Sequence, residues 1–340
     1  MFQKIKIISL VLISSSLSVA GSVNFDFRFE SDSASYNTAA KTAGAKESSQ
    51  FLMRTGRVDF KGLLNKDINY RLRLRVDRDS ETTQNKTDNF STQVDYAYIQ
   101  HKISERFALT AGKFASEVGS IEGNMSSPDI YMPTQAYKAI SANNFLYVSG
   151  AKLTYSQGEQ DASVFMVNQS ESQSTEQTKL AYGIGYKGSF LEKTLTPVAG
   201  YLSDEKQGTV SGAKLTTTIS SLGIKWDPQP YYLSFDYIVY AQKNITAVDV
   251  NDTATTMVFD AGYDFEGVIP KFKYELTKKT GSAKEQYDGV VVGVEFKPYP
   301  EDIFRYHVMV TQMNIKPDVG DSRFEQHLLV GTRIYGDFLK

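Results

Sequence analysis

Three arginines stand two residues apart in the segment INYRLRLRVD (68–77), a spacing that could serve anion chemistry. Arg71, Arg73 and Arg75 alternate there with large apolar residues. Successive side chains of a strand point to opposite faces, so a strand here has one apolar and one cationic face. Arginine keeps its charge, and its planar fork of donors suits phosphate or carboxylate. The spacing therefore predicts a cationic surface that meets water and passing anions.

Other basic residues are predicted to extend this surface from neighbouring strands. Strand parity places the following with the three arginines on one wall: Arg28, Arg57, Lys61 and Lys113. A second interpretation stays open, in which Asp59, Asp77 and Asp95 pair with the arginines and the strip only hydrates the wall. Rows of unpaired basic side chains would bias a pore toward anions.

No catalytic arrangement stands out. The histidines, His101, His307 and His327, are scattered, and cysteine is absent. No phosphate-cradling glycine loop and no HExxH spacing is present, so we expect no enzyme, no cofactor and no metal site. A formal net charge of -2 gives no support to a nucleic-acid partner, which usually requires a basic excess.

The N-terminus indicates export. Lys4 and Lys6 precede the apolar run Ile7–Ile13, and Ser18-Val19-Ala20 follows as a small-x-small cleavage site. This order is that of a secretory signal peptide. We predict a signal peptide over residues 1–20 and one domain over residues 21–340.

From Gly21 onward, segments of alternating polarity return through the whole chain. VNFDFRFE (23–30) is one example, and STQVDYAYIQHK (91–102) is another, with Val94, Tyr96 and Tyr98 predicted on its apolar face. We count roughly sixteen such strands. The connections predicted to be long are 31–50, 79–91, 115–146, 169–177, 203–213, 243–254, 279–287 and 315–323, and those predicted to be short are 62–67, 103–106, 157–161, 188–194, 227–230, 266–269 and 298–302.

Short turns at one end and long loops at the other are typical of a transmembrane β-barrel of antiparallel strands. In hydrocarbon only helices and closed barrels satisfy every backbone group, and about sixteen strands leave an aqueous channel. We predict an all-β transmembrane barrel with short periplasmic turns and long extracellular loops. The alternative is a soluble β-sandwich or β-solenoid, whose strands also alternate.

The chain resembles the bacterial outer-membrane porins, and most closely the phosphate-selective porin O and P group. The resemblance is carried by RVDFKG (57–62), YRLRLRVD (70–77), VDYAYIQH (94–101) and LTAGKFASEVGSIEG (109–123). It implies a 16-stranded barrel, usually a homotrimer in outer-membrane lipid, with the third extracellular loop folded into the lumen. One departure is the end of the chain, where the usual terminal phenylalanine is replaced by Phe338-Leu339-Lys340.

The longest connection, residues 115–146, suits the role of the constricting third loop. Pro128 and Pro133 would stiffen it. Its charged residues, predicted to form the constriction, are Glu117, Glu122, Asp129 and Lys138. The alternative is an ordinary surface loop.

These features predict a passive outer-membrane channel for small hydrophilic solutes and ions, with a basic wall strip and an acidic constriction loop. One alternative is a channel selective for anions or phosphate. Another is a non-conducting surface barrel or adhesin that presents its loops.

Overall fold

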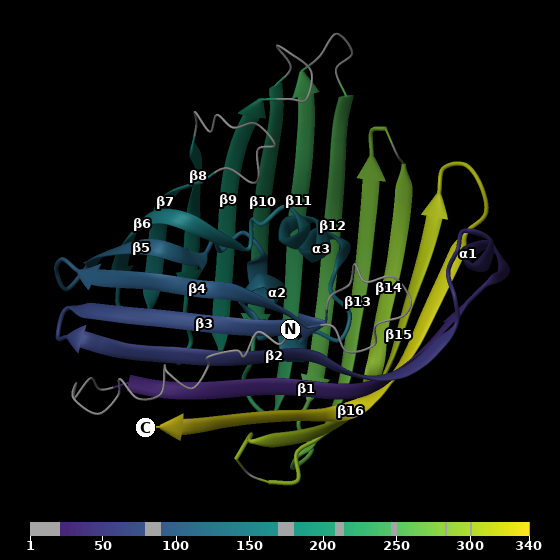
Figure 1. Ribbon diagram of the computed structural model, residues 1–340, viewed down its shortest axis with the longest axis horizontal. Coiled ribbons are helices and arrows are strands. Elements are labelled where there is room, and N and C mark those ends of the chain that lie inside the picture. The colour runs from purple at the N-terminus through teal and green to yellow at the C-terminus, as the bar shows by residue number, and fades with distance from the viewer. Residues whose placement is uncertain are drawn as a thin grey trace, which may run out of the picture.

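The computed structural model describes residues 21–78, 90–168, 180–207, 214–245, 250–282, 284–299 and 301–339. The described strands form one closed antiparallel barrel, in which each strand pairs with its sequence neighbours and β1 pairs with β16 (Figure 1). The prediction of a barrel of about sixteen strands is confirmed. The predicted signal peptide, residues 1–20, lies outside the described residues.

The strands are β1 (Gly21–Tyr36), β2 (Ser48–Asn65), β3 (Ile68–Arg78), β4 (Phe90–Lys102), β5 (Phe107–Ala115), β6 (Tyr147–Gln157), β7 (Gln160–Asn168), β8 (Leu180–Gly188), β9 (Leu195–Gln207), β10 (Lys214–Trp226), β11 (Tyr231–Ile245), β12 (Val250–Tyr263), β13 (Val268–Thr280), β14 (Glu285–Phe296), β15 (Phe304–Pro317) and β16 (Arg323–Leu339). The helices are α1 (Thr38–Thr42), α2 (Ser120–Asn124), the 3-10 turn η2 (Ser127–Asp129) and α3 (Gln135–Ala142). None of the described helices is long and apolar enough to cross a membrane.

The connections alternate in length less regularly than predicted. The long connection at 116–146 is present, but β13 and β14 are joined by 281–284 and β15 and β16 by 318–322. The connection 297–303, where the short turn 298–302 was predicted, is longer than either of these. The later strands continue into stretches that the sequence assigned to loops, because polar and basic residues such as Lys279 and Lys316 remain hydrogen-bonded in the sheet.

Two β-bulges change which face a side chain takes. On β2, Arg28 pairs with Thr55 and Phe29 with Met53, so Arg54 is the extra residue. At a bulge, two successive side chains can depart from the strict alternation between the two faces of the sheet. Arg54 therefore reaches the carboxylates of Glu30 and Asp32 on the lumen face, although its parity matches the outward Val58.

The second bulge lies on β4 and corrects a prediction. Arg73 pairs with Tyr96 and Leu74 with Val94, which leaves Asp95 as the extra residue. Val94 is exposed on the outer surface, whereas Tyr96 lies on the lumen side beneath an arginine. The prediction that Val94, Tyr96 and Tyr98 share one apolar face is therefore wrong for the two tyrosines.

Candidate functional site

The connection between β5 and β6, residues 116–146, is named loop 3 and folds into the barrel. Its helix α2 packs against β9–β11, α3 packs against β11 and β12, and η2 contacts β1 and β2 (Figure 1). The predicted folding of loop 3 into the lumen is confirmed. Loop 3 thus spans the barrel from one wall to the other and decides which paths through it stay open.

Glycines of the wall let the first part of loop 3 lie unusually close to the sheet. A Cβ atom on Gly200 of β9 would lie 2.6 Å from the carbonyl oxygen of Glu117. On β10, a Cβ atom on Gly223 would overlap both Ser120 Oγ and a carboxylate oxygen of Asp236. Real Cβ atoms essentially never approach so closely, so these positions require glycine for loop 3 to dock as it does.

Carboxylates from the wall hold the short helices of loop 3. Asp236 of β11 accepts hydrogen bonds from Ser120 Oγ (2.6 Å) and from the backbone N–H groups of Ile121 (3.0 Å) and Glu122 (3.3 Å). Asp236 is 3% exposed, and a buried carboxylate requires such donors. The N-terminal turn of α2 is therefore fixed to the wall by an acidic residue outside the loop.

The second half of loop 3 is held in the same way. Glu122 accepts from the backbone N–H of Thr134 at 3.0 Å and pairs with Lys273 Nζ at 3.3 Å. Glu275 of β13 accepts from the backbone N–H of Gln135, the first residue of α3, at 2.8 Å. Glu122, predicted as a constriction acid, is buried and serves to tie α2 to the segment before α3.

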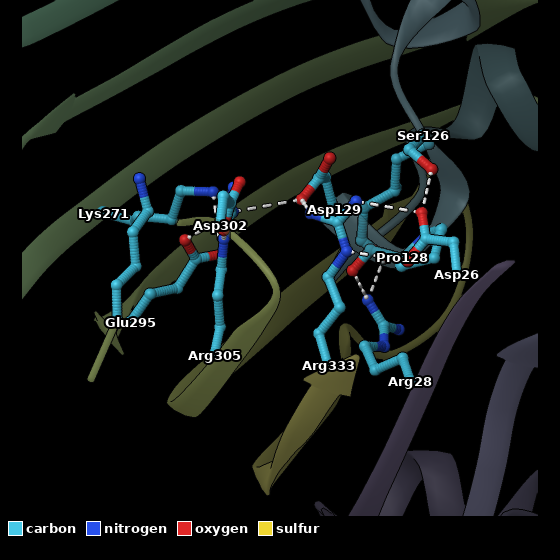
Figure 2. Close-up of polar contacts among 12 residues, drawn as sticks. Asp26, Arg28, Ser126, Pro128, Asp129, Lys271, Glu295, Asp302, Arg305 and Arg333 are labelled. Carbon is cyan, nitrogen blue, oxygen red and sulfur yellow. Dashed lines mark hydrogen bonds and ion pairs between the residues drawn. The ribbon is translucent and has the colours of Figure 1, made fainter. Parts of the chain in front are cut away.

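Three arginines on adjacent strands form hydrogen bonds with the middle of loop 3 (Figure 2). Arg28 on β1 pairs across the sheet with Arg333 on β16, which pairs with Arg305 on β15. We name these three residues the arginine row. Arg333 Nη1 lies 2.5 Å and Arg305 Nη1 3.4 Å from Asp129 Oδ1.

Arg28 binds the backbone of the same loop segment. Its Nη1 donates to the carbonyl oxygens of Pro128 (2.8 Å) and Ile130 (3.0 Å), on both sides of Asp129. Arg28 is 2% exposed. The loop segment 128–130 is therefore held by charge-assisted hydrogen bonds to both side chain and main chain.

Carboxylates surround the arginine row and offset its like charges. Asp26 accepts two hydrogen bonds from Arg333, at 2.8 and 2.9 Å, and Glu30 pairs with Arg28 at 3.3 Å. Glu295 and Asp302 pair with Arg305. This balance keeps the row compatible with burial, since an unpaired buried charge would cost several kcal/mol.

Tyr131 lies two residues after Asp129 in loop 3 and links the loop to β13 and β14. Its hydroxyl donates to Glu295 Oε1 at 2.8 Å, and Lys271 Nζ pairs with the same oxygen at 3.0 Å. Burial and the nearby Glu295 carboxylate raise the pKa of Tyr131 well above its usual value. The phenol therefore stays neutral and remains a hydrogen-bond donor.

The basic strip of β2 and β3 carries carboxylates between its arginines. Arg71 and Arg73 both reach Asp59 Oδ2, at 2.6 and 2.9 Å, and Arg75 pairs with Asp95 at 3.0 Å. Pairing with Asp59 and Asp95, as the second interpretation expects, is thus present. The Asp77 side chain lies outside the described residues.

The ring of Tyr96 packs against two arginines of the strip. Its ring centroid lies 4.0 Å from the guanidinium carbon of Arg71 and 4.7 Å from that of Arg73. Arg57, 4% exposed, lies 3.7 Å from Asp95 and reaches Ser126 of loop 3. Through Arg57 the strip therefore reaches loop 3. In the other direction along β2 it extends to Lys61, whose side chain is 45% exposed.

Three other predicted site residues lie apart from the arginine row and the basic strip. Lys113 pairs across the sheet with Ala97 and Ser149, which are exposed on the outer surface, so it belongs to the outward face and corrects the prediction that it lines the pore. Lys113 and Leu109 lie an even number of positions apart on β5, so the sequence pattern already indicated that Lys113 faces outward with Leu109. Glu117 lies at the base of loop 3, where it accepts from Lys152 Nζ at 2.8 Å. Lys138 is exposed on α3.

Two cavities lie on opposite sides of loop 3. The outer vestibule, about 600 Å³, lies toward the 318–322 loop and is lined by Ile315 and Glu325 among others. The inner vestibule, about 470 Å³, is lined by residues of the turn 227–230. A cavity of about 20 Å³ between Asp129–Tyr131 and Lys271–Lys273 shares lining residues with both. The loop segment held by the arginine row therefore lines a small cavity that lies between the two vestibules.

Sequence reasoning missed Arg305 and Arg333. Parity places each of them on the lumen face of its strand, and that signal was available in the sequence. Their alignment at one level with Arg28 depends on strand register, which the sequence pattern leaves undefined. Within the described part of the chain, no group of three histidine or carboxylate side chains is arranged to hold a metal ion.

Comparisons with known proteins agree with this architecture. The outer membrane channel DcaP of Acinetobacter baumannii superposes with a TM-score of 0.72 at 10% identity, covering 95% of this chain and 99% of that chain. An anion-selective porin from Comamonas acidovorans gives 0.69 at 12% identity, covering 94% and 100%. The trimer form of OmpT from Vibrio cholerae gives 0.65 at 11% identity, covering 93% and 100%. At these identities the likeness concerns the fold.

A search against curated protein sequences gave no significant match. The family model of phosphate-selective porin O and P matches residues 23–228, more than half of the chain. The chain therefore belongs to the phosphate-selective porin O and P family.

Proposed function

We propose that the protein is a passive diffusion channel for small hydrophilic solutes and ions, with a weak preference for anions, and that it works as a homotrimer. Family membership places it in the bacterial outer membrane. The anion preference rests on the lumen wall, and the trimer rests on the likeness to the trimer form of OmpT. No catalytic step is part of this proposal.

The observation that carries the anion preference is the charge balance of the basic strip. Five cations, Arg57, Lys61, Arg71, Arg73 and Arg75, share two described carboxylates, Asp59 and Asp95. The strip also passes loop 3, since Arg57 contacts Ser126 of that loop while Arg75 lines the outer vestibule. An excess of fixed positive charge along an aqueous wall favours anions.

The preference is proposed to be weak because other parts of the lumen mix both signs. The inner vestibule is lined by Lys187, Lys225 and Lys271, together with Asp227 and Asp260. Opposite charges at close range offset each other within a Debye length of about 8 Å at physiological salt. A solute leaving the strip therefore meets a nearly balanced field.

Reversal potentials in a KCl gradient across planar bilayers test this proposal. The wild type should favour chloride modestly. Neutralising Arg71, Arg73 and Arg75 together to Gln removes three of the five cations, leaving two beside the described carboxylates of Asp59 and Asp95, and should abolish the preference. Lys113→Gln, a charge loss on the outer face, is the matched control and should leave the potential unchanged.

Other results would redirect the conclusion. A strong chloride preference that collapses in the triple variant would favour a dedicated anion channel. Absence of conductance steps would favour a non-conducting barrel that presents its loops. Sedimentation of the detergent-solubilised protein as a monomer would contradict the trimer.

A further inference from the structure

The outer vestibule has an apolar wall, which is unusual for a water-filled barrel lumen. On β15 the lumen-facing residues change from Arg305 and His307 near loop 3 to three apolar residues and one threonine toward the 318–322 loop: Met309, Thr311, Met313 and Ile315. Leu329 of β16 continues this patch on the neighbouring strand. Apolar side chains in contact with channel water are unfavourable unless something covers them.

Loop 3 covers only the deeper part of this patch. Met132 packs into a cluster with Met309, Met313 and Leu329, all nearly inaccessible. This contact accounts for the buried residues as an anchor for the loop. Beside this cluster, Tyr131, Pro133 and Tyr137 of loop 3 and Ile315 of β15 are only half-buried and line the vestibule.

The same cavity also carries cationic side chains, most of them paired with carboxylates of the wall. Arg28, Arg54, Arg75 and Lys138 line it, against the carboxylates of Asp32 and Glu325. The Arg54 side chain is 36% exposed and that of Arg75 15% exposed, so both side chains are partly open to the cavity. His327 lies between the two carboxylates, 2.7 Å from each.

We propose that the outer vestibule is a binding site for amphipathic organic anions, small molecules that join a carboxylate to an apolar chain or ring. The apolar part would lie against Ile315, Pro133 and Tyr131, and the carboxylate would face Arg54, Arg75 and Lys138. The volume of about 600 Å³ is in the range of small-molecule sites. This inference rests on the proposed channel function and specifies a solute class for it.

The site is expected to bind weakly. A solute must leave the site for permeation to continue, and conduction requires binding that is favourable but reversible. The cationic groups already have carboxylate partners, so a solute carboxylate shares them instead of neutralising bare charges. The discrimination between solutes should therefore come mainly from the apolar wall.

Blockade of chloride current in planar bilayers tests the proposal, with acetate, hexanoate or hexylamine added on the side of the 318–322 loop. Hexanoate should block about tenfold more strongly than acetate, since part of its chain leaves water, and hexylamine should not block. Ile315→Thr should lower the hexanoate-to-acetate ratio about threefold. Ile269→Thr, the same substitution in the inner vestibule, is the matched control and should leave the ratio unchanged.

The outcomes separate this inference from the proposed function. Equal blockade by hexanoate and acetate in a conducting channel would overturn the inference and leave the channel function standing. The inference would fail in the same way if Ile269→Thr lowered the ratio and Ile315→Thr did not. Absence of conductance would overturn both.

Discussion

Replacing Asp129 with alanine should loosen loop 3 and make the channel more anion-selective. The Asp129 carboxylate, 21% exposed, accepts from Arg333 and Arg305 of the arginine row. After its loss, Arg333 keeps Asp26, and Arg305 keeps Glu295 and Asp302. The arginines therefore stay satisfied, and the effect should appear in the loop.

The mechanical effect follows from the lost contact. A hydrogen bond to a charged group contributes about 1.5–3 kcal/mol. A loss of about 2 kcal/mol raises the population of detached loop tips about 30-fold. Arg28 still holds the carbonyls of Pro128 and Ile130, so loop 3 should stay in the lumen on average. The result should be larger current noise with a modest rise in mean conductance.

The electrostatic effect is independent of loop motion. For an ion passing about 8 Å from the carboxylate in water, one unit charge contributes about 0.5 kcal/mol. Removing it lowers the barrier for anions and raises it for cations by that amount. The chloride-to-potassium permeability ratio should therefore rise about fivefold in dilute salt, and less in 1 M salt, where the Debye length is about 3 Å.

Single-channel recording with a salt gradient measures both effects. Asp302→Ala is the matched control, because Asp302 also pairs with Arg305 but lies on the turn 297–303, away from loop 3. That variant should change current noise little. If Asp129→Ala and Asp302→Ala raise the noise equally, or if neither does, Asp129 does not tether the loop.

Three further substitutions test how the site is held together. Gly223→Ala should displace α2 from Asp236 and lower the unfolding temperature, measured by heat-dependent gel migration, at a cost of about 1–3 kcal/mol; an unchanged temperature would mean that the loop yields freely. Tyr96→Leu removes two cation–π contacts and should cost about 1–2 kcal/mol by denaturant titration. Tyr155→Leu, away from the strip, should cost less, and an equal cost would mean that these contacts do not stabilise the strip. Arg28→Met should increase current noise more than Asp129→Ala does, because it removes the hydrogen bonds to the loop backbone. Less noise than in the wild type would mean that these hydrogen bonds do not hold the loop.

The barrel was predictable because its physics is repetitive. Each strand must show lipid an apolar face, so residues such as Leu72 and Leu74 recur at a period of two, and the number of strands follows. The bulges at Arg54 and Asp95 were not predictable, because one inserted residue looks like a slightly irregular alternation. That irregularity was visible at Arg54, and its meaning becomes clear only from the register.

The candidate site was predictable in part for the same reason. Arginines at 71, 73 and 75 indicate a wall strip through their spacing alone. The arginine row depends instead on three strands whose positions 28, 305 and 333 come to one level only when the barrel closes between β1 and β16. Such long-range alignment is fixed by hydrogen-bond register, which local patterns do not encode.

The close contact between wall glycines and loop 3 has a consequence for how the bore of the channel can change. Because Gly200 and Gly223 lie in the sheet, a side chain added there would act as a spacer beneath the loop. The width of the passage is thus set partly by residues that never touch a solute. Evolution or engineering can adjust it from the wall, with every residue of loop 3 left as it is.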